Sequence, residues 1–289
     1  MMNVSKNMIF KISLLILLVP GFFGCSLRNV ALDYHEFVAS RMAASYLDLN
    51  GEQTDLFKKR WKVFAVRLAT DRIEPLVQII ELLGETTKPQ EQVYHLQKIA
   101  GEVMTDACVD FSPLMAELSA KQVEHLKKKI EERNEKNDPD KNGGLADFRK
   151  LKREEFSDLL ERWLGQILEV QKQMLIDFDN EKDSKGDWER DYLAYSREAQ
   201  GVFLSFLIGG MGHSDMMSVK CSQFVLSPES HLSEASRKTK ANLATSREKN
   251  LESLYGTLDL QQKKHFMQET RSLAQDLRKW AGSVRANKS

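Results

Sequence analysis

The chain has 289 residues, of which 42% are hydrophobic and 29% are charged, and its 42 basic side chains balance 42 acidic ones. This balance argues against a protein that binds nucleic acid, which needs a strongly basic surface. The hydrophobic content excludes an intrinsically disordered chain, and a chain of this length can bury about 75% of the surface that it exposes when unfolded. We therefore expect a folded, soluble body with a sizeable core.

The first 24 residues have the features of a targeting segment. Two lysines precede an apolar run at residues 12–23, which is too short to cross a bilayer as a permanent helix. The run ends at Gly24-Cys25, which resembles the lipobox of bacterial lipoproteins. The resemblance implies that residues 1–24 are a cleaved signal peptide and that the sulfur of Cys25 carries a diacylglycerol. The alternative is an ordinary secretory signal that is cleaved near this cysteine.

A lipid on Cys25 would fix the location of the protein. Two or three acyl chains hold a protein on a membrane essentially permanently, because each buried CH₂ contributes roughly 0.8 kcal/mol. The mature chain would be a single helical periplasmic domain, residues 25–289, which begins with a short tether at residues 25–32. Ser26, rather than an aspartate, follows the cysteine, and by resemblance to enterobacterial sorting this favours the outer membrane. We expect a lipid-anchored protein of the bacterial cell envelope that faces the periplasm.

Apolar residues recur at helical spacing along the chain, and no stretch shows the alternation of a strand. The clearest stripe covers residues 145–178, and a second one, rich in aromatic residues, covers residues 188–206. Turn-forming clusters fall at residues 138–144 and 184–186, and a longer irregular segment is expected at residues 208–224. These patterns predict an all-α fold of seven or eight amphipathic helices in an elongated antiparallel bundle without a sheet.

Three stretches repeat the same pattern of a leucine, a polar residue and, three places later, a glutamine. They are residues 49–57, 118–126 and 258–266. The polar side chain can accept a hydrogen bond from the first turn of a helix, and the glutamine can return one, which makes a capping box. The pattern predicts helix starts at Asn50, Ser119 and Asp259. Their spacing predicts a fourth copy near residue 188, where a capping residue is present but the glutamine is not.

The repeated pattern also resembles the LTxxQ motif of small, stress-induced periplasmic chaperones of bacteria. A broader resemblance, to a family of helical lipoproteins of Gram-negative bacteria, covers nearly the whole mature chain. It rests on Cys25, on a Tyr-x-Asp-Leu-x-x-x-Gln segment that ends at Gln53, and on the segment RWLGQILEVQ that ends at Gln171. This resemblance implies a helical architecture, but the family has no established activity to carry over.

Cys108 and Cys221 are the two remaining cysteines of the mature chain. Because the periplasm is oxidising, one possibility is a disulfide between them, and the other is two buried thiols. A bridge across these 221 − 108 = 113 positions would stabilise the fold by up to about 4 kcal/mol.

The turn cluster DPDKNGG is the best candidate for a metal site. Asp138, Asp140 and Asn142 occupy positions 1, 3 and 5 of an EF-hand loop, and Gly143 occupies position 6. Position 12, however, is Arg149, where a glutamate should complete the coordination of calcium. We therefore expect a polar turn between two helices and no metal site.

Further candidates for chemistry are weak. One cluster offers soft ligands for copper(I), but its spacing matches no ligand motif, and methionines commonly fill gaps in a core. Its members are Met211, His213, Met216, Met217 and Cys221. The six histidines are scattered, and neither a His-Glu-x-x-His nor a Gly-x-Ser-x-Gly motif occurs. We expect no catalytic residues, no enzyme activity and no cofactor besides the lipid on Cys25; a hydrolase is the most distant alternative.

The aromatic stripe is the candidate surface for binding. Such a stripe is usually core, but where it is exposed it binds apolar segments of another chain. Its members are Trp188, Tyr192, Tyr195, Phe203 and Phe206. We expect a protein that acts by binding, as a chaperone-like protein or an assembly factor of the envelope. The alternative is a scaffold or adaptor with one dedicated partner in the envelope or the cell wall. The expected partners are the membrane, through the lipid, and other envelope proteins, but not nucleic acid.

Overall fold

The computed structural model describes residues 32–86, 89–183 and 188–287. These residues form helices and no strand, which confirms the all-α fold. The expected signal peptide (1–24) and Cys25 lie outside the described residues, as does the tether up to its last residue. The helices are α3 (His35–Leu47), α4 (Gly51–Arg67), α5 (Ile73–Glu85), α6 (Pro89–Ala116), α7 (Ala120–Lys136), α8 (Leu145–Leu164), α9 (Glu169–Asp183), α10 (Trp188–Gly210), α11 (Ser214–Leu226), α12 (Glu234–Gly256) and α13 (Leu260–Ala286). Three short elements join them: the π-helical turn η1 (Leu68–Arg72) and the 3₁₀ turns η2 (Pro139–Lys141) and η3 (Pro228–His231).

The number of helices is larger than expected. α4, η1 and α5 follow one another without a break and make one continuous helix. When they are counted as one, the described residues form ten helices instead of seven or eight. Part of the difference lies at residues 208–224, which were expected to be irregular but contain most of α11. Gly210 is the last residue of α10 and packs against Met217. Gly212 lies in the turn between α10 and α11 and has a φ of 76°. The expectation of a long irregular segment is therefore wrong.

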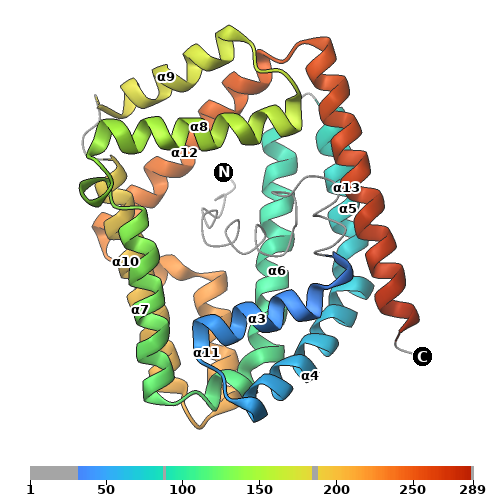
Figure 1. Cartoon of the computed structure of the whole chain (residues 1–289), viewed down its shortest axis with the longest axis vertical. Coiled ribbons are helices and arrows are strands. Elements are labelled where there is room, and N and C mark those ends of the chain that lie inside the picture. Colours follow the sequence, from blue (N-terminus) through green and yellow to red (C-terminus); the bar gives the residue numbers. More distant parts are fainter. Residues whose placement is uncertain (1–31, 87–88, 184–187, 288–289) are drawn as a thin grey trace.

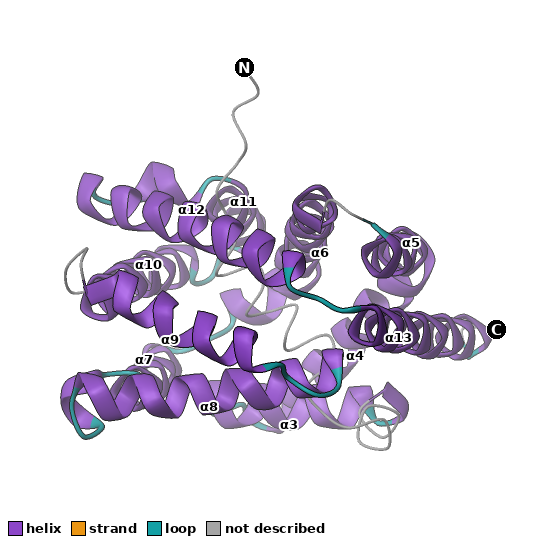
Figure 2. Cartoon of the chain, turned by 90° about the horizontal axis from the view of Figure 1, so that it is seen from above, coloured by secondary structure: helices purple, strands orange, loops and turns teal. Residues whose placement is uncertain are grey.

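Figure 1 shows the helices arranged along the sides of a frame. α5, α6 and α13 run along one long side, and α7 and α10 run along the other, while α8 and α9 cross one end and α3 crosses near the opposite end. Figure 2 shows that α9 lies between α8 and α12. The helices therefore do not share one axis, and the arrangement differs from the elongated antiparallel bundle that the periodicity suggested.

The largest apolar cluster lies between α4, α5, α6 and α13. Phe64, Val77 and Ala274 are almost completely buried within it. α5 and α13 pack so closely that a Cβ on Gly84 would lie 3.2 Å from the Cα of Met267. Smaller clusters lie between α8, α9 and α12 and between α7, α10 and α11. Each side of the frame thus has a core of its own.

The three predicted capping boxes are present. The side chains of Asn50, Ser119 and Asp259 each accept a hydrogen bond from the amide three residues later, and the glutamine at that position accepts one in return. They start α4, α7 and α13. These helix starts follow from local sequence alone.

The capping glutamines also pair with one another across the fold. Gln53 Nε2 donates to Gln122 Oε1 at 3.2 Å, and Gln122 Nε2 donates to Gln53 Oε1 at 2.6 Å. Each amide donates once more to a backbone carbonyl, from Gln53 to Glu117 and from Gln122 to Asp48. Both side chains are buried, so the reciprocal pair joins the start of α4 to the start of α7 with its polar groups satisfied.

A second reciprocal pair joins the starts of α9 and α13. Gln171 Nε2 donates to Gln262 Oε1 at 2.8 Å, and Gln262 Nε2 donates to Gln171 Oε1 at 2.9 Å. The amide of Leu168 donates to Gln171 Oε1 at 3.0 Å, as the cap amide does in a capping box. Residues 168–171 therefore repeat the glutamine half of the capping box, with Leu168 in place of the polar capping residue. The cap of the copy expected near residue 188 lies outside the described residues. Figure 1 places the starts of α4 and α7 at one end of the molecule and those of α9 and α13 at the other.

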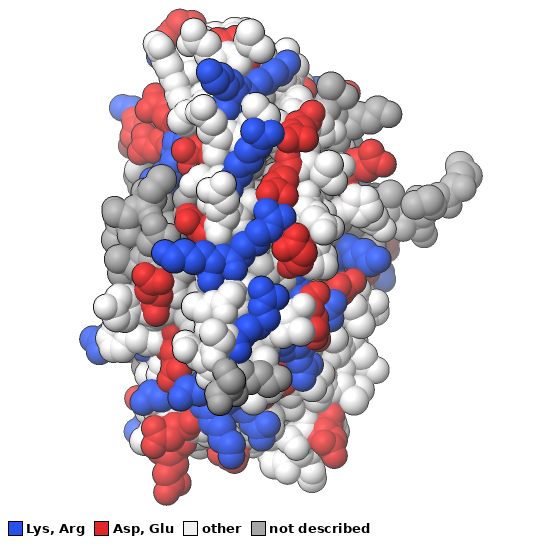
Figure 3. Space-filling view, turned by 90° about the vertical axis from the view of Figure 1, so that its right-hand side faces the viewer, with Lys and Arg blue, Asp and Glu red and all other residues white. Residues whose placement is uncertain are grey.

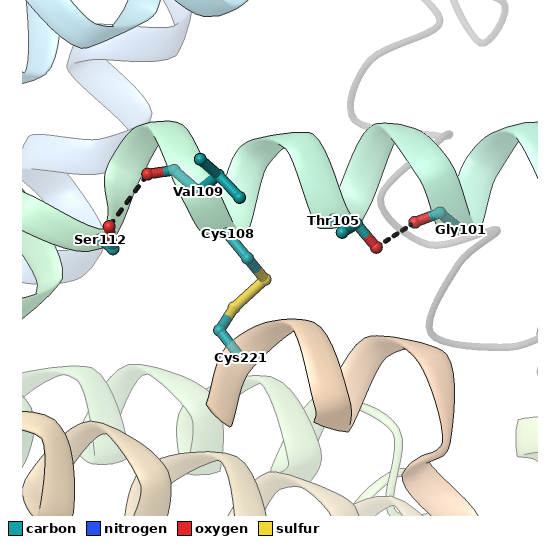
Figure 4. Close-up of a disulfide and its surroundings, with 6 residues drawn as sticks. All are labelled: Gly101, Thr105, Cys108, Val109, Ser112 and Cys221. Carbon is teal, nitrogen blue, oxygen red and sulfur yellow. Dashed lines mark hydrogen bonds between the residues drawn. A yellow bond between two sulfur atoms is a disulfide. The ribbon is translucent and has the colours of Figure 1, made fainter. Parts of the chain in front are cut away.

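Cys108 of α6 and Cys221 of α11 form a disulfide, with the two Cα atoms 5.5 Å apart (Figure 4). Both cysteines are buried, together with Met104 and Val225. The bridge joins two helices that are separated by 113 positions in the sequence. It therefore ties two sections of the frame together covalently.

The surface along α13 carries mixed charge. Figure 3 shows basic and acidic side chains interspersed over this face. Arg278 of α13, for example, lies between Glu74 and Glu81 of α5, with nitrogen–oxygen distances of 2.9 and 2.6 Å. Within the described part of the chain, no helix is both long enough and apolar enough to cross a membrane.

Candidate functional site

The aromatic stripe of α10 does not form an exposed face. Tyr195 is 5% exposed and packs with Leu232, and two phenylalanines of the stripe contact Phe224 of α11. The other residues of the stripe are half-buried; the set is Trp188, Tyr192, Tyr195, Phe203 and Phe206. The reason is that α11, in the segment expected to be irregular, is a helix that covers one side of α10. The stripe is therefore part of the core.

An exposed apolar face lies on α3 and its first flanking residue. Tyr34 and Phe37 are 62% and 65% exposed, although aromatic side chains of this size are usually buried. Three further apolar residues on the same helix are exposed, at the spacing of three or four that places them on one face. They are Val38, Met42 and Tyr46. Sequence reasoning passed over this helix, because its apolar residues look like an ordinary core-facing stripe.

A hollow of about 690 Å³ lies beside this face, between α3 and α4. We call it the α3–α4 groove. Phe37, Met42 and Tyr46 form its apolar part, and Ser40, Arg41, Ala44, Ser45, Thr54 and Lys58 complete its lining. Among these described lining residues, two are cations and none is a carboxylate. The groove is thus an open, largely apolar surface with a positive edge.

The opposite side of α3 is fixed to the core through His35. The indole N–H of Trp61 donates a hydrogen bond of 2.8 Å to Nδ1 of His35, and the imidazole lies edge-on to Trp280, with ring centroids 5.5 Å apart. An indole N–H can only donate, so Nδ1 carries no proton. Burial lowers the pKa of His35, and Glu36 opposes this shift only in part. The neutral imidazole therefore holds α3 against the core while its apolar face points outward.

The turn that resembles an EF-hand loop is held by arginines. Asp140 accepts hydrogen bonds from Arg190, the shorter one 2.6 Å long, and Asp138 Oδ1 accepts one from the amide of Asp140. Arg149, at the twelfth position, forms a buried ion pair with Glu189 at 2.8 Å. The carboxylates of this turn thus face cationic side chains, and the turn is a polar connection between α7 and α8, as expected.

The other weak candidates are dispersed. Cys221 is bonded to Cys108 and is therefore not a thiolate ligand. Met217 is 1% exposed and packs against Leu207 and Gly210. In the described ranges, no group of three or more histidine, cysteine, aspartate or glutamate side chains is arranged to hold a metal ion.

The comparisons with known proteins give one match. The profile of a family of unknown function, DUF6279, matches residues 45–205, which is more than half of the chain. Neither the curated proteins nor the solved structures contain a match. The matched residues begin at the end of α3 and include three of the four paired glutamines, Gln53, Gln122 and Gln171. The chain therefore belongs to the DUF6279 family.

Proposed function

We propose that this protein is a lipid-anchored envelope protein that binds apolar segments of other envelope proteins in the α3–α4 groove, as a chaperone-like protein or assembly factor. The observation that carries the proposal is the exposure of the apolar face of α3. Tyr34 and Phe37 are both more than 60% exposed, and a contiguous exposed apolar patch on a folded protein commonly marks an interaction site.

The position of the groove fits a lipid anchor on Cys25. Tyr34 follows Cys25 by 34 − 25 = 9 residues, and an extended chain of this length spans at most about 30 Å. An anchor at Cys25 would hold the groove within this distance of the membrane, where envelope proteins emerge. A lipid-free Cys25→Ala protein should appear in the soluble periplasmic fraction. A variant that stays with the membrane would contradict the anchor.

The lining of the groove indicates what it binds. Phe37, Met42 and Tyr46 offer apolar contacts for one face of an amphipathic segment. Methionine adapts to partners of different shape. Arg41 and Lys58 lie beside these residues, and they would pair with acidic side chains at the edge of the bound segment. The favoured partner is an amphipathic protein segment with acidic flanks.

Photo-crosslinking in living cells tests this proposal. A photoreactive phenylalanine analogue would replace Phe37, Met42 or Tyr46, one at a time. Leu260 is the matched control site, because it is 84% exposed and apolar but starts α13, away from the groove. We expect adducts with several envelope proteins at the three groove positions and none at Leu260. No adduct in the groove, or adducts with lipid alone, would contradict protein binding.

The same experiment separates the chaperone from the second candidate, an adaptor with one dedicated partner. The adaptor is favoured by the limited size of the groove, which is bounded by polar residues such as Ser45 and Thr54. A single adduct of one mass at all three positions would establish the adaptor. A chaperone should in addition slow the aggregation of an unrelated unfolded protein, and the double variant Phe37→Ser, Met42→Ser should lose this activity.

A further inference from the structure

A second cavity lies between α8, α9, α12 and the start of α10, in the region where Figure 2 shows α9 between α8 and α12. Its volume is about 430 Å³, which is within the usual range for small-molecule sites. Its apolar walls are Phe156 of α8, Leu175 and Phe178 of α9 and Trp188 of α10. Leu175 is buried and Phe156 is 43% exposed, so the cavity extends from the core to the surface.

The charges that line this cavity are predominantly positive. Among the described residues of its lining, Lys152, Arg153 and Arg247 are cationic, and Asp179 is the one carboxylate. Arg153 forms an ion pair with Asp179, and Lys152 contacts Glu155 at 2.8 Å. The lining thus has an excess of positive charge.

Arg247 differs from the other two cations. Among the described residues, Arg247 has no hydrogen bond and no ion pair with a carboxylate, and only Tyr192 and Tyr195 interact with its charge. Burial lowers the pKa of its guanidinium, and the nearby Tyr192 and Tyr195 oppose this shift only in part. A partly desolvated cation without a counter-charge is costly, and an anion bound beside it would remove that cost.

Asn250 supplies a second polar group next to Arg247. The two residues are three positions apart on α12, so their Cβ atoms lie about 5–6 Å apart on the same face. Asn250 Oδ1 is buried and accepts no hydrogen bond. The cavity therefore presents a cation without an anion next to apolar walls, and Asn250 is a further polar residue of its lining.

We propose that this cavity binds a small anionic amphiphile. Its carboxylate or phosphate would meet Arg247, and its apolar chain would pack against Phe178 and Trp188. Such a molecule would arrive either free in solution or as part of a lipid. This site is separate from the α3–α4 groove and does not depend on the function proposed for it.

Isothermal titration calorimetry with a matched pair of ligands tests the proposal. The protein is the Cys25→Ala chain, and the ligands are N-decanoylglycine, which has a carboxylate, an amide and an apolar chain, and the neutral N-decanoylglycinamide. Both are used below the concentration at which they form micelles. We expect the carboxylate to bind about ten-fold to a hundred-fold more tightly, because a hydrogen bond to a charged group is worth that factor. Equal affinities, or no binding of the carboxylate, would overturn the proposal.

Variants assign the difference to Arg247. Arg247→Gln should bind the carboxylate as weakly as the neutral ligand, whereas Arg247→Lys should keep part of the preference. Arg271→Gln is the control, because this exposed arginine of α13 pairs with Glu85 of α5 and does not line the cavity. A preference that survives in Arg247→Gln would overturn the assignment, and the ligand pair tests the unaltered cavity if that variant does not fold.

Two further ligands distinguish the source of the anion. Inorganic phosphate should bind far more weakly than N-decanoylglycine, because it cannot use the apolar walls; comparable affinity would contradict an amphiphile. Competition by phosphatidylglycerol vesicles would identify a lipid as the source, and its absence would identify a soluble ligand.

Discussion

Arg149 occupies the position at which a calcium loop needs a glutamate, and its contacts show what it does instead. Its Nε and Nη2 atoms donate hydrogen bonds of 2.9 and 2.8 Å to the carboxylate of Glu189. Both side chains are less than 10% exposed. The removal of one partner from such a pair leaves an uncompensated buried charge, which is far more costly than the loss of a surface pair. The pair fixes the start of α8 to the start of α10.

We expect Glu189→Ala to lower the free energy of unfolding by about 3–5 kcal/mol. Asp140→Ala is the matched control, because it removes the exposed pair with Arg190 in the neighbouring turn and should lower the free energy of unfolding far less than Glu189→Ala does. Denaturation with urea measures both values. Similar costs for the two variants would show that burial does not decide the strength of these pairs.

His35 makes the attachment of α3 sensitive to pH. The folded protein holds this histidine neutral, with a pKa below the ordinary value of 6.5, mainly because it is buried. Below pH 6.5 the unfolded chain therefore binds a proton that the folded protein does not bind. The contribution of His35 to stability is complete above pH 6.5, and it is lost as the pH falls from there through the lowered pKa.

The corresponding prediction compares melting temperatures at pH 7.5 and pH 5. The parent protein should lose more stability on acidification than His35→Gln, which keeps an acceptor for the indole N–H of Trp61 but does not titrate. Differential scanning calorimetry gives the two losses. The prediction fails if both proteins lose the same amount.

At the scale of elements, the repeated glutamines have two roles. Each one completes the cap of its own helix, and each also forms a reciprocal amide pair with a glutamine from a distant helix. A primary amide suits both roles because it has two donors and an acceptor on one side chain. A glutamate could accept but not donate, and two glutamates would repel each other. The pairs therefore explain why the pattern uses glutamine each time.

A double-mutant cycle tests the pairing. Gln53→Ala and Gln122→Ala should each lower the free energy of unfolding by about 1–3 kcal/mol, because the partner amide stays buried without its hydrogen bonds. The double variant should cost less than the sum, by about 0.5–3 kcal/mol. The control combines Gln53→Ala with Gln262→Ala, from the other pair, and should be additive within about 0.5 kcal/mol. Additivity in both cycles would reject the pairing.

At the scale of the whole molecule, the disulfide between Cys108 and Cys221 closes a long covalent loop. It joins α6 and α11 across 113 positions, and the two helices pack on each other. A frame with several small cores depends on such connections, because no single core contacts every helix. The bridge restricts the unfolded chain as well as fixing the folded one.

We expect the double variant Cys108→Ala, Cys221→Ala to be less stable than the parent by about 4 kcal/mol. Cys25→Ala is the control and should leave the stability unchanged, because the expected lipid anchor precedes the described fold. Equilibrium denaturation under oxidising conditions measures both. A loss well below about 2 kcal/mol would show that the two helices are held by packing alone.

Local sequence determined the features that depend on neighbouring residues. The all-α class follows from apolar spacing, and the starts of α4, α7 and α13 follow from side chains that bond amides three positions away. Tertiary contact decided the rest. It made α10 core by placing α11 upon it, left the face of α3 exposed, and brought Gln171 to Gln262 across 91 positions. Apolar periodicity shows that a helix has an apolar face, but which helix covers that face depends on contacts between residues that are far apart in the chain.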